Sequence, residues 1–315
     1  MATINDIAEI TGYSKSTISR ALKNNTRISK KTRDEILKIA KELNYLPNSK
    51  AVSLSTGRSF TLGVIVPYPT FNSYYANIIH SIINATFKKG YKVSFLPSNY
   101  DKETELSYLK MLQAKEFDGL IITSAANSYT LIAEFLKYGM IVSCEETGSS
   151  GVSSVILERI QGYASGFAAL QKLKIKHIGL CFSRTLKNSV GAREVLQFFK
   201  DKLPHFTDRT IFENCREFDD GIKAGEYFSQ LSPQIEAIFA NSDEIAAGII
   251  QFYQQHNLSL PIIIGQENQA IGKFLQISSI DFRLEELGKE AVDMCLNGEF
   301  DKKILKSRFY HRGNL

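Results

Sequence analysis

The sequence predicts an N-terminal all-α headpiece with a helix-turn-helix, followed by a larger α/β core of two doubly wound parallel-sheet subdomains. Three observations support this fold. Residues 3–22 have the periodicity of two short amphipathic helices joined at a glycine. Beyond residue 60, apolar strand-like runs alternate with helical segments, and the alternation starts again after residue 155. The length of 315 residues suits a small headpiece and a core of two similar halves.

The first two helices are expected from capping residues and from one apolar face each. Thr3 can cap the first helix, and Gly12 ends it. Its apolar positions have the spacing of one helical face: Ile4, Ile7, Ala8 and Thr11. Ser14 can cap the second helix. Its inward positions are Ile18, Ala21 and Leu22. Two short helices joined by a tight turn form the helix-turn-helix pattern, whose second helix lies in the DNA major groove.

A third helix is expected over residues 29–43, with Ser29 as its cap. Its apolar stripe can close a three-helix core: Ile36, Leu37, Ile39, Ala40 and Leu43. Two amphipathic helices with a glycine turn also occur in many domains that bind no DNA. The third helix favours the DNA-binding interpretation.

The positive charge of the chain belongs to the headpiece. Up to Arg58 there are eleven Lys and Arg against five Asp and Glu, a net charge of +6, whereas the remainder has 27 against 28, a net charge of −1. A small basic domain on a nearly neutral body is typical of binding to the phosphate backbone of DNA.

Three residues of the second helix are the candidates for contacting base edges: Lys15, Ser16 and Arg20. A long cation can donate to guanine O6 and N7 in the major groove, whereas serine is too short to predict a base. Small polar residues nearby can instead donate to phosphates, which fixes position without reading sequence. They are Ser14, Thr17, Ser19, Asn25 and Thr26. An ordinary capping or solvated role is the alternative for each of these.

Several motifs recur along residues 2–57. They are Ala2-Thr3-Ile4 with Asp6-Ile7-Ala8, Gly12-x-Ser14-x-Ser16-Thr17-Ile18-Ser19-Arg20-x-Leu22, Ile28-Ser29-x-x-Thr32-Arg33, Leu43-x-Tyr45-x-Pro47-Asn48, and Ala51-x-x-Leu54 before Thr56-Gly57. In this order and spacing they resemble the lactose-repressor (LacI/GalR) family of bacterial transcription regulators, and the core resembles that family too. The resemblance implies a homodimer, a near-palindromic DNA operator, and a core similar to a periplasmic sugar-binding protein.

The resemblance divides the chain into a helix-turn-helix domain (1–47), a hinge (48–58) and an effector-binding and dimerisation core (59–315). It implies that the hinge folds into a helix when two subunits meet on DNA, and that Leu54 wedges between base pairs of the minor groove. An ordinary linker helix, with Leu54 packed on the core, is the alternative. Further DNA contacts implied by the family motifs are Thr3, Asn48 and Ala51.

The core is expected to contain two parallel sheets covered on both faces. Predicted strands are 61–66, 91–96, 119–123, 141–144, 177–182, one near 211, 237–240 and 262–264. Predicted helices are 74–89, 102–114, 131–138, 161–173, 190–202, 221–231 and 244–256. The chain should recross between the halves near 280–283 and again near 303–306, which gives an N-subdomain of about 59–156 plus 283–302 and a C-subdomain of about 157–282 plus 303–315. Helices 74–89 and 284–296 are expected to build the dimer face.

An effector is expected in a cleft between the halves, because ligands of such sheets bind at the carboxyl ends of the strands. The family resemblance places three charged residues there: Arg193, Asp243 and Glu267. A cation near two carboxylates suits a neutral polyhydroxylated ligand such as a sugar. Aromatic residues that follow strand ends or lie at a crossover could stack on sugar faces: Tyr68, Phe71, Tyr74, Tyr129, Phe182 and Phe282. A single aromatic residue of this kind more often belongs to the core than to a cleft, so a core position is the alternative for each.

Enzymes and exported solute-binding proteins are the rival classes. The sequence offers no phosphate-cradling glycine loop, zinc-ligand spacing or nucleophile elbow, so neither catalysis nor a cofactor nor a metal is expected. The four cysteines are far apart and are expected to be buried free thiols: Cys144, Cys181, Cys215 and Cys295. Without a signal segment or a long apolar run, a cytoplasmic location is expected. Induction by the ligand, activation by a corepressor, and enhancement by a phosphocarrier partner are all compatible with the sequence.

Overall fold

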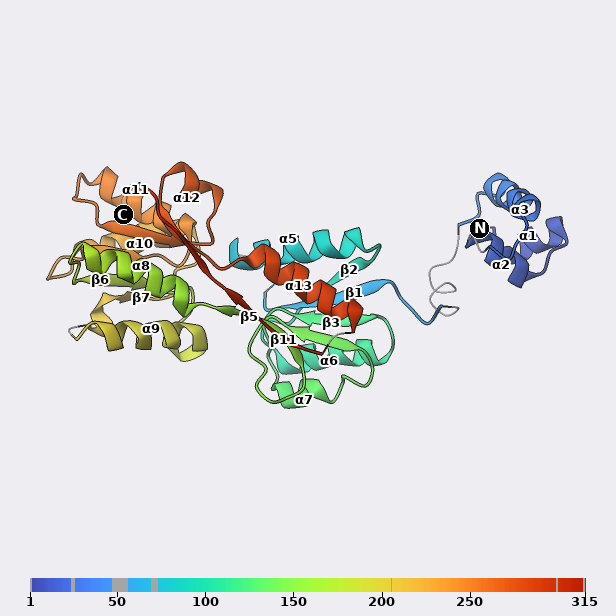
Figure 1. The fold of residues 1–315 in the computed structure, drawn as a ribbon, viewed down its shortest axis with the longest axis horizontal. Helices are drawn as coiled ribbons and strands as arrows, with labels where there is room; N and C mark the ends of the chain where they lie inside the picture. Colours follow the sequence, from blue (N-terminus) through green and yellow to red (C-terminus); the bar gives the residue numbers. More distant parts are fainter. Residues whose placement is uncertain are drawn as a thin grey trace. The chain divides into compact units, whose positions relative to one another are not determined.

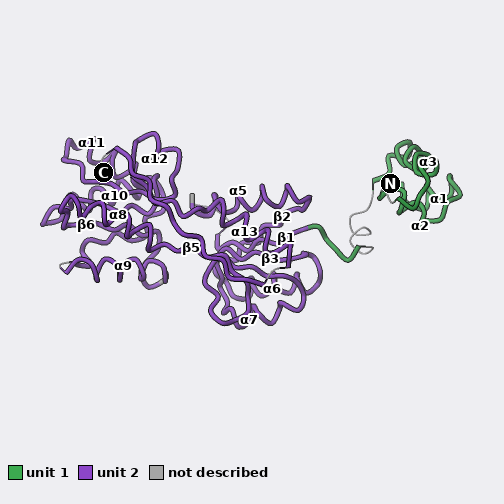
Figure 2. The backbone as a smooth tube through the Cα atoms, viewed as in Figure 1, with its two compact units in different colours: residues 1–60 green, residues 61–315 purple. Residues whose placement is uncertain are grey.

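The computed structural model describes residues 2–23, 26–46, 56–68, 73–204, 206–298, 300–313 and 315. The chain divides into two compact units, Met1–Phe60 and Thr61–Leu315, which are coloured separately in Figure 2. The observed boundary lies close to the predicted start of the core at residue 59. Most of the predicted hinge (48–58) lies outside the described residues. Among the described residues, no helix combines the length and apolarity that crossing a membrane requires.

The described part of the N-terminal unit contains α1 (Ile4–Thr11), α2 (Lys15–Leu22) and α3 (Lys30–Glu42). Each of these helices begins after a residue whose hydroxyl accepts a hydrogen bond from a backbone N–H two or three positions ahead: Thr3, Ser14 and Ser29. Gly12 has a φ of +70°, in the left-handed region that favours glycine, so the chain can turn tightly between α1 and α2. The predicted helix-turn-helix is therefore present.

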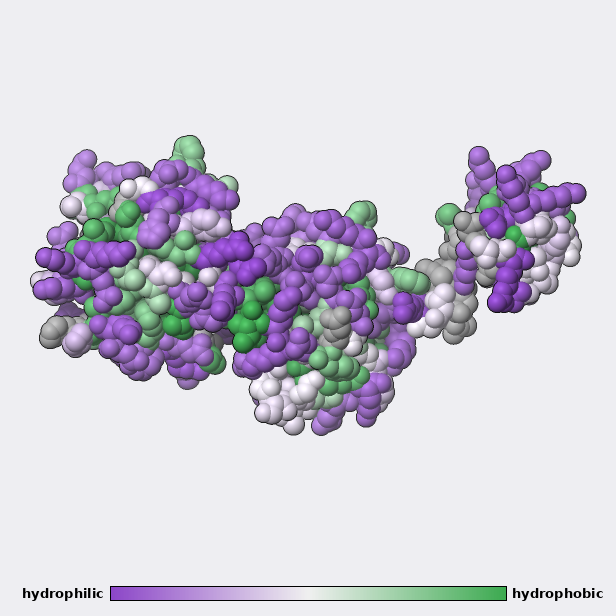
Figure 3. All heavy atoms as spheres, viewed as in Figure 1, coloured by the Kyte–Doolittle hydropathy of each residue, from purple (hydrophilic) through white to green (hydrophobic). Residues whose placement is uncertain are grey.

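The three helices share a small apolar core. It is formed by Ile7, Ile18, Ala21, Ile36 and Ala40. The prediction for the third helix was wrong at Leu37, whose side chain is 44% exposed. One residue along a helix is a rotation of about 100°, so a neighbour of the fully buried Ile36 turns toward solvent. In Figure 3, hydrophilic side chains gather on the upper part of this unit, beside side chains of intermediate hydropathy.

The first sheet of the core has the strand order β11-β5-β4-β3-β1-β2. Its strands are β1 (Thr61–Val66), β2 (Lys92–Pro97), β3 (Gly119–Ile122), β4 (Met140–Ser143), β5 (Ser153–Glu158) and β11 (Lys302–Lys306). Its helices are α5 (Ser73–Lys88), α6 (Lys102–Gln113), α7 (Tyr129–Ala133) and α13 (Leu284–Asn297). The strand pairs are all parallel, as predicted. Helix α7 is shorter than the predicted helix at 131–138.

Alternate residues of the first sheet enter two different apolar clusters, because successive side chains of a strand point to opposite faces. Leu62 and Val64 of β1 pack in the cluster that contains α5 and α13 residues, whereas Ile65 packs with α6 and α7. Helices α5 and α13 lie side by side on their face, as Figure 1 shows. Both faces of the sheet are therefore covered.

The second sheet has the order β12-β10-β9-β8-β6-β7. Its strands are β6 (Ile178–Cys181), β7 (Ile211–Phe212), β8 (Ala237–Phe239), β9 (Ile262–Gln266), β10 (Ser278–Asp281) and β12 (Arg308–Tyr310). Its helices are α8 (Ile160–Lys172), α9 (Val190–Lys202), α10 (Phe218–Ser229), α11 (Asp243–Gln255) and α12 (Ala270–Phe274), with short 3-10 turns at η1 (Leu186–Asn188) and η2 (Asp208–Thr210). Only the β10–β12 pair is antiparallel among these strands. All four cysteines are buried and free.

The chain passes between the two sheets three times. It leaves the first sheet after β5, returns between β10 and α13, and leaves again between β11 and β12. The predicted recrossings are confirmed, but the predicted subdomain limits at 156 and 302 differ from the observed pairing. Lys302–Lys306 pairs along its whole length with the strand ending at Glu158, so residues 157–158 and 303–306 belong to the N-subdomain.

Candidate DNA-binding surface and effector pocket

Helix α2 has an outward face of the kind that contacts bases. Lys15, Ser16 and Arg20 are exposed, whereas Ile18 and Ala21 on the opposite side are buried in the three-helix core. The buried face fixes how the helix is rotated, and this rotation sets which side chains can enter a groove. The outward face carries two cations and no carboxylate, which suits guanine edges and phosphates.

The hydroxyl groups at the start of α2 form a local network. Ser14 Oγ accepts from the Thr17 N–H at 3.2 Å and lies 2.8 Å from Ser16 Oγ and 2.9 Å from Thr17 Oγ1. A hydroxyl has one donor and two acceptor positions, so these contacts use all three positions of Ser14 Oγ and leave positions open on Ser16 and Thr17. Thr3 and Thr26 are exposed and Ser19 is half-buried. The remaining predicted DNA contacts lie outside the described residues: Asn25, Asn48, Ala51 and Leu54.

The core has a polar cavity of about 370 Å³ that both sheets help to form. Its described lining residues are Tyr68, Tyr100, Arg184, Thr185, Asn214 and Arg216. Tyr68 and Tyr100 follow β1 and β2 of the first sheet; the other four follow β6 and β7 of the second. All six therefore lie beyond the carboxyl ends of parallel strands, where open α/β sheets bind ligands. Among the predicted residues, Tyr68 lines this cavity.

One side-chain pair joins the two halves at this cavity. Arg184 Nη1 donates to Tyr100 Oη at 2.9 Å, and the guanidinium lies 4.7 Å from the centre of the Tyr100 ring. Tyr68 packs edge-on against the same ring, with the ring centres 5.4 Å apart. Across the cavity lining, Arg216 Nε donates to the Ser183 carbonyl at 3.2 Å. Tyr100 is thus held between an aromatic neighbour and a cation from the other subdomain.

A chain of hydrogen bonds links the Tyr100 hydroxyl to the carboxylate of Glu145 in the first subdomain. Tyr100 Oη lies 3.0 Å from Ser124 Oγ, and Ser124 Oγ donates to Glu145 Oε1 at 2.6 Å. Tyr129 Oη, predicted as an effector contact, lies 2.6 Å from Ser143 Oγ and donates to Glu145 Oε2 at 3.3 Å. Burial, followed by the charge of Glu145, raises the pKa of the Tyr129 phenol.

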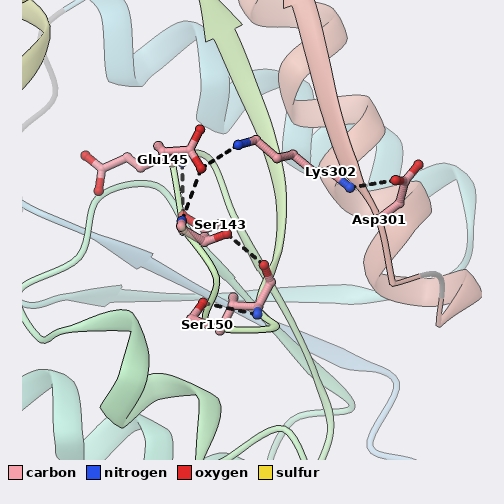
Figure 4. Close-up of polar contacts among 9 residues, drawn as sticks. Ser143, Glu145, Ser150, Asp301 and Lys302 are labelled. Atoms are coloured by element: carbon pink, nitrogen blue, oxygen red, sulfur yellow. Dashed lines mark hydrogen bonds and ion pairs between the residues drawn. The ribbon is translucent and has the colours of Figure 1, made fainter.

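A hydrogen bond between backbone and side chain fixes the strand-end turn that holds Glu145. The Glu145 N–H donates to Ser143 Oγ at 3.0 Å, as drawn in Figure 4. The neighbouring Glu146 forms an ion pair with Lys302 Nζ at 2.6 Å. A second hollow of about 380 Å³ lies beside this turn and includes Tyr129 in its lining. Tyr129 therefore borders a different cavity from the one that contains Tyr68.

Tyr74 and Phe282 meet around an arginine that the sequence analysis did not identify. Arg159, at the first crossover, donates from Nη2 to Tyr74 Oη at 2.7 Å. Its guanidinium lies 5.3 Å from the Tyr74 ring centre and 5.0 Å from that of Phe282. Burial raises the pKa of Tyr74, and the charge of Arg159 opposes this effect. Phe282 and Phe182 are buried in the apolar cluster, so their place is the core.

The three predicted charged residues lie in local hydrogen-bond networks and do not line the described cavity. Arg193 Nη1 donates to the carbonyls of Leu186 and Lys187, at 2.6 and 3.1 Å. Asp243 is fully buried and accepts from the Gln269 N–H and from Ser279 Oγ, both at 2.7 Å.

Asp243 has room only because two neighbouring positions are glycine. A Cβ atom on Gly265 or Gly272 would overlap its carboxylate. Burial raises the pKa of Asp243 to about 6. Glu267 Oε2 accepts from Gln269 Nε2 at 2.7 Å, in the same loop. In this structure the two carboxylates hold the loop after β9, and an effector contact for them, or for Arg193, stays a prediction.

Five of the six described lining residues were not predicted from the sequence. They are Tyr100, Arg184, Thr185, Asn214 and Arg216. One available signal was position, since each follows a predicted strand by a few residues. Phe71, another predicted contact, lies outside the described residues.

The fold and these sites define a class of protein: a helix-turn-helix transcription regulator with a periplasmic-binding-protein-like core. Residues 3–48 match the family model described as bacterial regulatory proteins, lacI family. Residues 59–310 match the model described as periplasmic binding proteins and sugar binding domain of LacI family. The chain belongs to the LacI family of bacterial regulatory proteins.

Relatives and solved structures match along nearly the whole chain. Catabolite control protein B of Bacillus subtilis (strain 168) is 35% identical over 302 residues, covering 95% of this chain and 96% of that protein. The NTD biosynthesis operon regulator NtdR of Bacillus subtilis (strain 168) is 32% identical, covering 97% of both. The lac repressor dimer bound to operator and the anti-inducer ONPF has a TM-score of 0.85 at 20% identity, covering 99% of this chain and 98% of that one, which establishes likeness of fold.

Proposed function

We propose that this chain is a homodimeric, sequence-specific DNA-binding repressor whose affinity for its operator is controlled by a small effector in the core. The observation that carries the proposal is the outward face of α2, where Lys15, Ser16 and Arg20 are exposed opposite a buried apolar face. The effector is a sugar or a sugar derivative, and the regulated genes serve carbohydrate use. The family model for sugar-binding domains, which matches residues 59–310, supports this choice.

Two copies are needed for useful specificity. One recognition helix contacts only a few base pairs, so twofold pairing on a near-palindromic operator multiplies the discrimination between sites. One of the relatives named above, NtdR, is an operon regulator, which supports the same role for this chain.

The dimer face is proposed to include α5 and the edge strand β2. Three large apolar side chains there face solvent in the single chain: Ile83 at 39% exposure, Phe87 at 80% and Phe95 at 41%. Exposed apolar groups on neighbouring elements suit an interface. Helix α13 packs against α5 and the sheet through one face, which includes the buried Leu287 and Ala291, and its place in the dimer face stays a prediction.

Substitution of the most exposed of these residues tests the interface. Phe87→Asp places a charge where a partner would bury apolar surface, so the dimer should dissociate at least ten-fold more readily, measured by sedimentation equilibrium. Phe274→Asp is the control, because Phe274 is 85% exposed on α12 of the other subdomain. Equal dissociation constants for the two variants and the wild-type protein would show that α5 is not at the interface.

Effector control follows from differential affinity. A ligand that binds one arrangement of the two subdomains more tightly than the other shifts the population toward that arrangement, and DNA affinity changes by the same coupling free energy. An inducer favours the arrangement that binds DNA poorly; a corepressor favours the other. A phosphocarrier protein could act as such a corepressor on the outside of the core.

The experiment that tests the function is selection of DNA from a library of random duplexes by the full-length protein. The expected result is a near-palindromic site bound at least a hundred-fold more tightly than scrambled DNA at the same salt concentration. Adding sugars and sugar derivatives to the selected complex then shows the sign of the response. Enrichment of no sequence would reject the repressor function, and turnover of any added sugar would support the rival enzymatic function.

A further inference from the structure

The effector cavity has an unbalanced positive charge. Its described lining contains two arginines, Arg184 and Arg216, together with two tyrosines, Thr185 and Asn214. No aspartate or glutamate occurs in this described lining. Residues 69–72, which adjoin Tyr68 in the sequence, are Pro-Thr-Phe-Asn and therefore contain no carboxylate either. A neutral sugar would leave both guanidinium charges without a counter-charge.

Two acidic residues close to the lining residues in sequence are already engaged. Glu213 Oε1 accepts from the Leu186 N–H at 2.7 Å. Asp220 Oδ2 accepts from the backbone N–H groups of Arg216 and Glu217, and Asp220 Oδ1 pairs with Lys223 Nζ at 2.9 Å. These bonds direct the two carboxylates to the backbone and to a lysine. Neither carboxylate therefore neutralises the charge of the two arginines in the cavity lining.

Both guanidiniums retain donors for a ligand. Each arginine has five N–H groups in a planar fork. Among the described residues, Arg184 uses Nη1 for the Tyr100 hydroxyl and Arg216 uses Nε for the Ser183 carbonyl. The bonds anchor each side chain at one nitrogen and leave other N–H groups of the fork available. Planar forks of this kind bind phosphate and carboxylate oxygens through paired, charge-assisted hydrogen bonds.

From this lining we propose that the effector is a phosphorylated sugar, with its phosphate bound by Arg184 and Arg216 and its sugar ring facing Tyr68 and Tyr100. This proposal rests on the proposed function, because it names the ligand class of the same cavity. A phosphate monoester carries about −1.5 to −2 charge at pH 7, which matches two guanidiniums, whereas a sugar acid carries one charge and a free sugar none. A volume of about 370 Å³ lies in the range of small-molecule sites.

The proposal replaces the neutral ligand that the sequence analysis favoured. That expectation depended on Arg193 lying near Asp243 and Glu267, but Arg193 binds the carbonyls of Leu186 and Lys187. Asp243 is fully buried beneath the loop after β9. The cations that line the cavity are therefore different from the predicted one, and they have no carboxylates beside them in the described lining.

The test is calorimetric titration of the full-length protein with matched ligands. The panel contains glucose, fructose, galactose, mannose and ribose, their monophosphates, the sugar acids gluconate and glucuronate, and inorganic phosphate. At least one monophosphate should bind at least ten-fold more tightly than its parent sugar and than either sugar acid. Equal or tighter binding of parent sugars or sugar acids would overturn the proposal, and so would failure of every monophosphate to bind.

Single substitutions then locate the phosphate. Arg184→Gln and Arg216→Gln should each weaken binding of that monophosphate by about ten- to a hundred-fold, because a charge-assisted hydrogen bond is removed. Binding of the parent sugar should change less than three-fold. Arg209→Gln is the control, since Arg209 is an exposed arginine of η2 outside the described cavity lining. Unchanged monophosphate affinity in both pocket variants would place the phosphate elsewhere and overturn the proposal.

Selection of DNA by the same preparations tests the repressor function separately from the ligand assignment. If the protein enriches an operator and a neutral sugar alone releases it, the repressor function stands and the phosphorylated-sugar proposal fails. If no operator is enriched, the repressor function itself fails. Tight, arginine-dependent binding of a monophosphate would still support the ligand assignment in that case.

Discussion

The DNA-contacting face and the effector cavity are assembled in opposite ways. Lys15, Ser16 and Arg20 lie on one helix of eight residues, with their orientation fixed by two buried neighbours. The cavity residues Tyr68 and Arg184 come from strand ends in two different sheets. A surface built from one helix can be deduced from local periodicity. A cavity built from four strand ends depends on how the whole core folds.

The largest expected effect is a loss of operator preference that leaves the effector cavity unaffected. The double substitution of Lys15 and Arg20 by Ala should reduce the preference for the selected operator by about 1–3 kcal/mol for each base that the protein no longer reads, while effector affinity stays the same. Fluorescence anisotropy on operator and scrambled duplexes measures the preference. Lys38→Ala is the control, since Lys38 is an exposed cation of α3 paired loosely with Glu42 at 3.9 Å. An unaltered preference in the double variant would show that α2 is not the recognition helix.

The separate core of the headpiece gives the second prediction. Ile36→Ala should lower the free energy of unfolding of the N-terminal unit by about 2–5 kcal/mol, because removing a fully buried side chain leaves a cavity. Urea unfolding followed at headpiece and core amides by NMR should show the loss of stability only in residues 1–60. Leu37→Ala, one position away and 44% exposed, should cost about 0.5 kcal/mol. Equal costs would contradict the observed rotation of α3.

A buried carboxylate gives the core a pH dependence. The pKa of Asp243 is raised to about 6 in the folded protein, above its ordinary value of 3.8. Between these two values the folded state holds a proton that the unfolded state has released, so this residue's contribution to stability decreases as pH rises from about 4 to 6 and is constant above. The decrease amounts to at most about 3 kcal/mol.

Asp243→Asn removes that titration while keeping both hydrogen bonds, because its oxygen can accept from the Gln269 N–H and its amide can donate to Ser279 Oγ. The difference in unfolding free energy between variant and wild-type protein should therefore grow in favour of the variant from pH 4 to 6, measured by urea unfolding. Asp301→Asn, a change of an exposed carboxylate, is the control. A difference that is independent of pH would show that Asp243 titrates normally.

The smallest effect concerns the pair that joins the subdomains. Tyr100→Phe removes the hydroxyl that accepts from Arg184, and should cost about 0.5–1.5 kcal/mol of core stability and also alter effector affinity. Tyr108→Phe removes a comparable hydroxyl, which donates to the Pro97 carbonyl at 2.9 Å, and should change stability alone. Thermal unfolding and calorimetry distinguish the two readouts. Identical effector affinities in both variants would show that the Arg184–Tyr100 pair is irrelevant to the site.

Local rules therefore predicted the headpiece and the strand–helix alternation of the core well. The capping hydroxyls of Thr3, Ser14 and Ser29 and the turn at Gly12 depend on neighbours within three residues, and all are present. Leu37 was assigned to the wrong face because a wide apolar stripe on a short helix leaves its edge undefined. The edge is decided by packing against the other helices.

Local sequence rules could not predict which residues line the cavity. Arg193 and Arg184 are both cations after β6, and the sequence does not say which one reaches across the cleft. The choice is made by the carbonyls of the 3-10 turn, which bind Arg193, and by the Tyr100 ring, which holds Arg184. Asp243 was expected in the cleft because of its charge. Its burial depends on two glycines more than twenty residues away in sequence.

The threefold passage of the chain between the sheets determines the order in which the molecule can fold during synthesis. The N-terminal unit is one continuous segment and can fold as soon as it leaves the ribosome. The first sheet, in contrast, lacks its covering helix α13 and its edge strand β11 until Lys306 has been made. Nascent chains therefore expose an incomplete apolar sheet until the last residues of the core have been made.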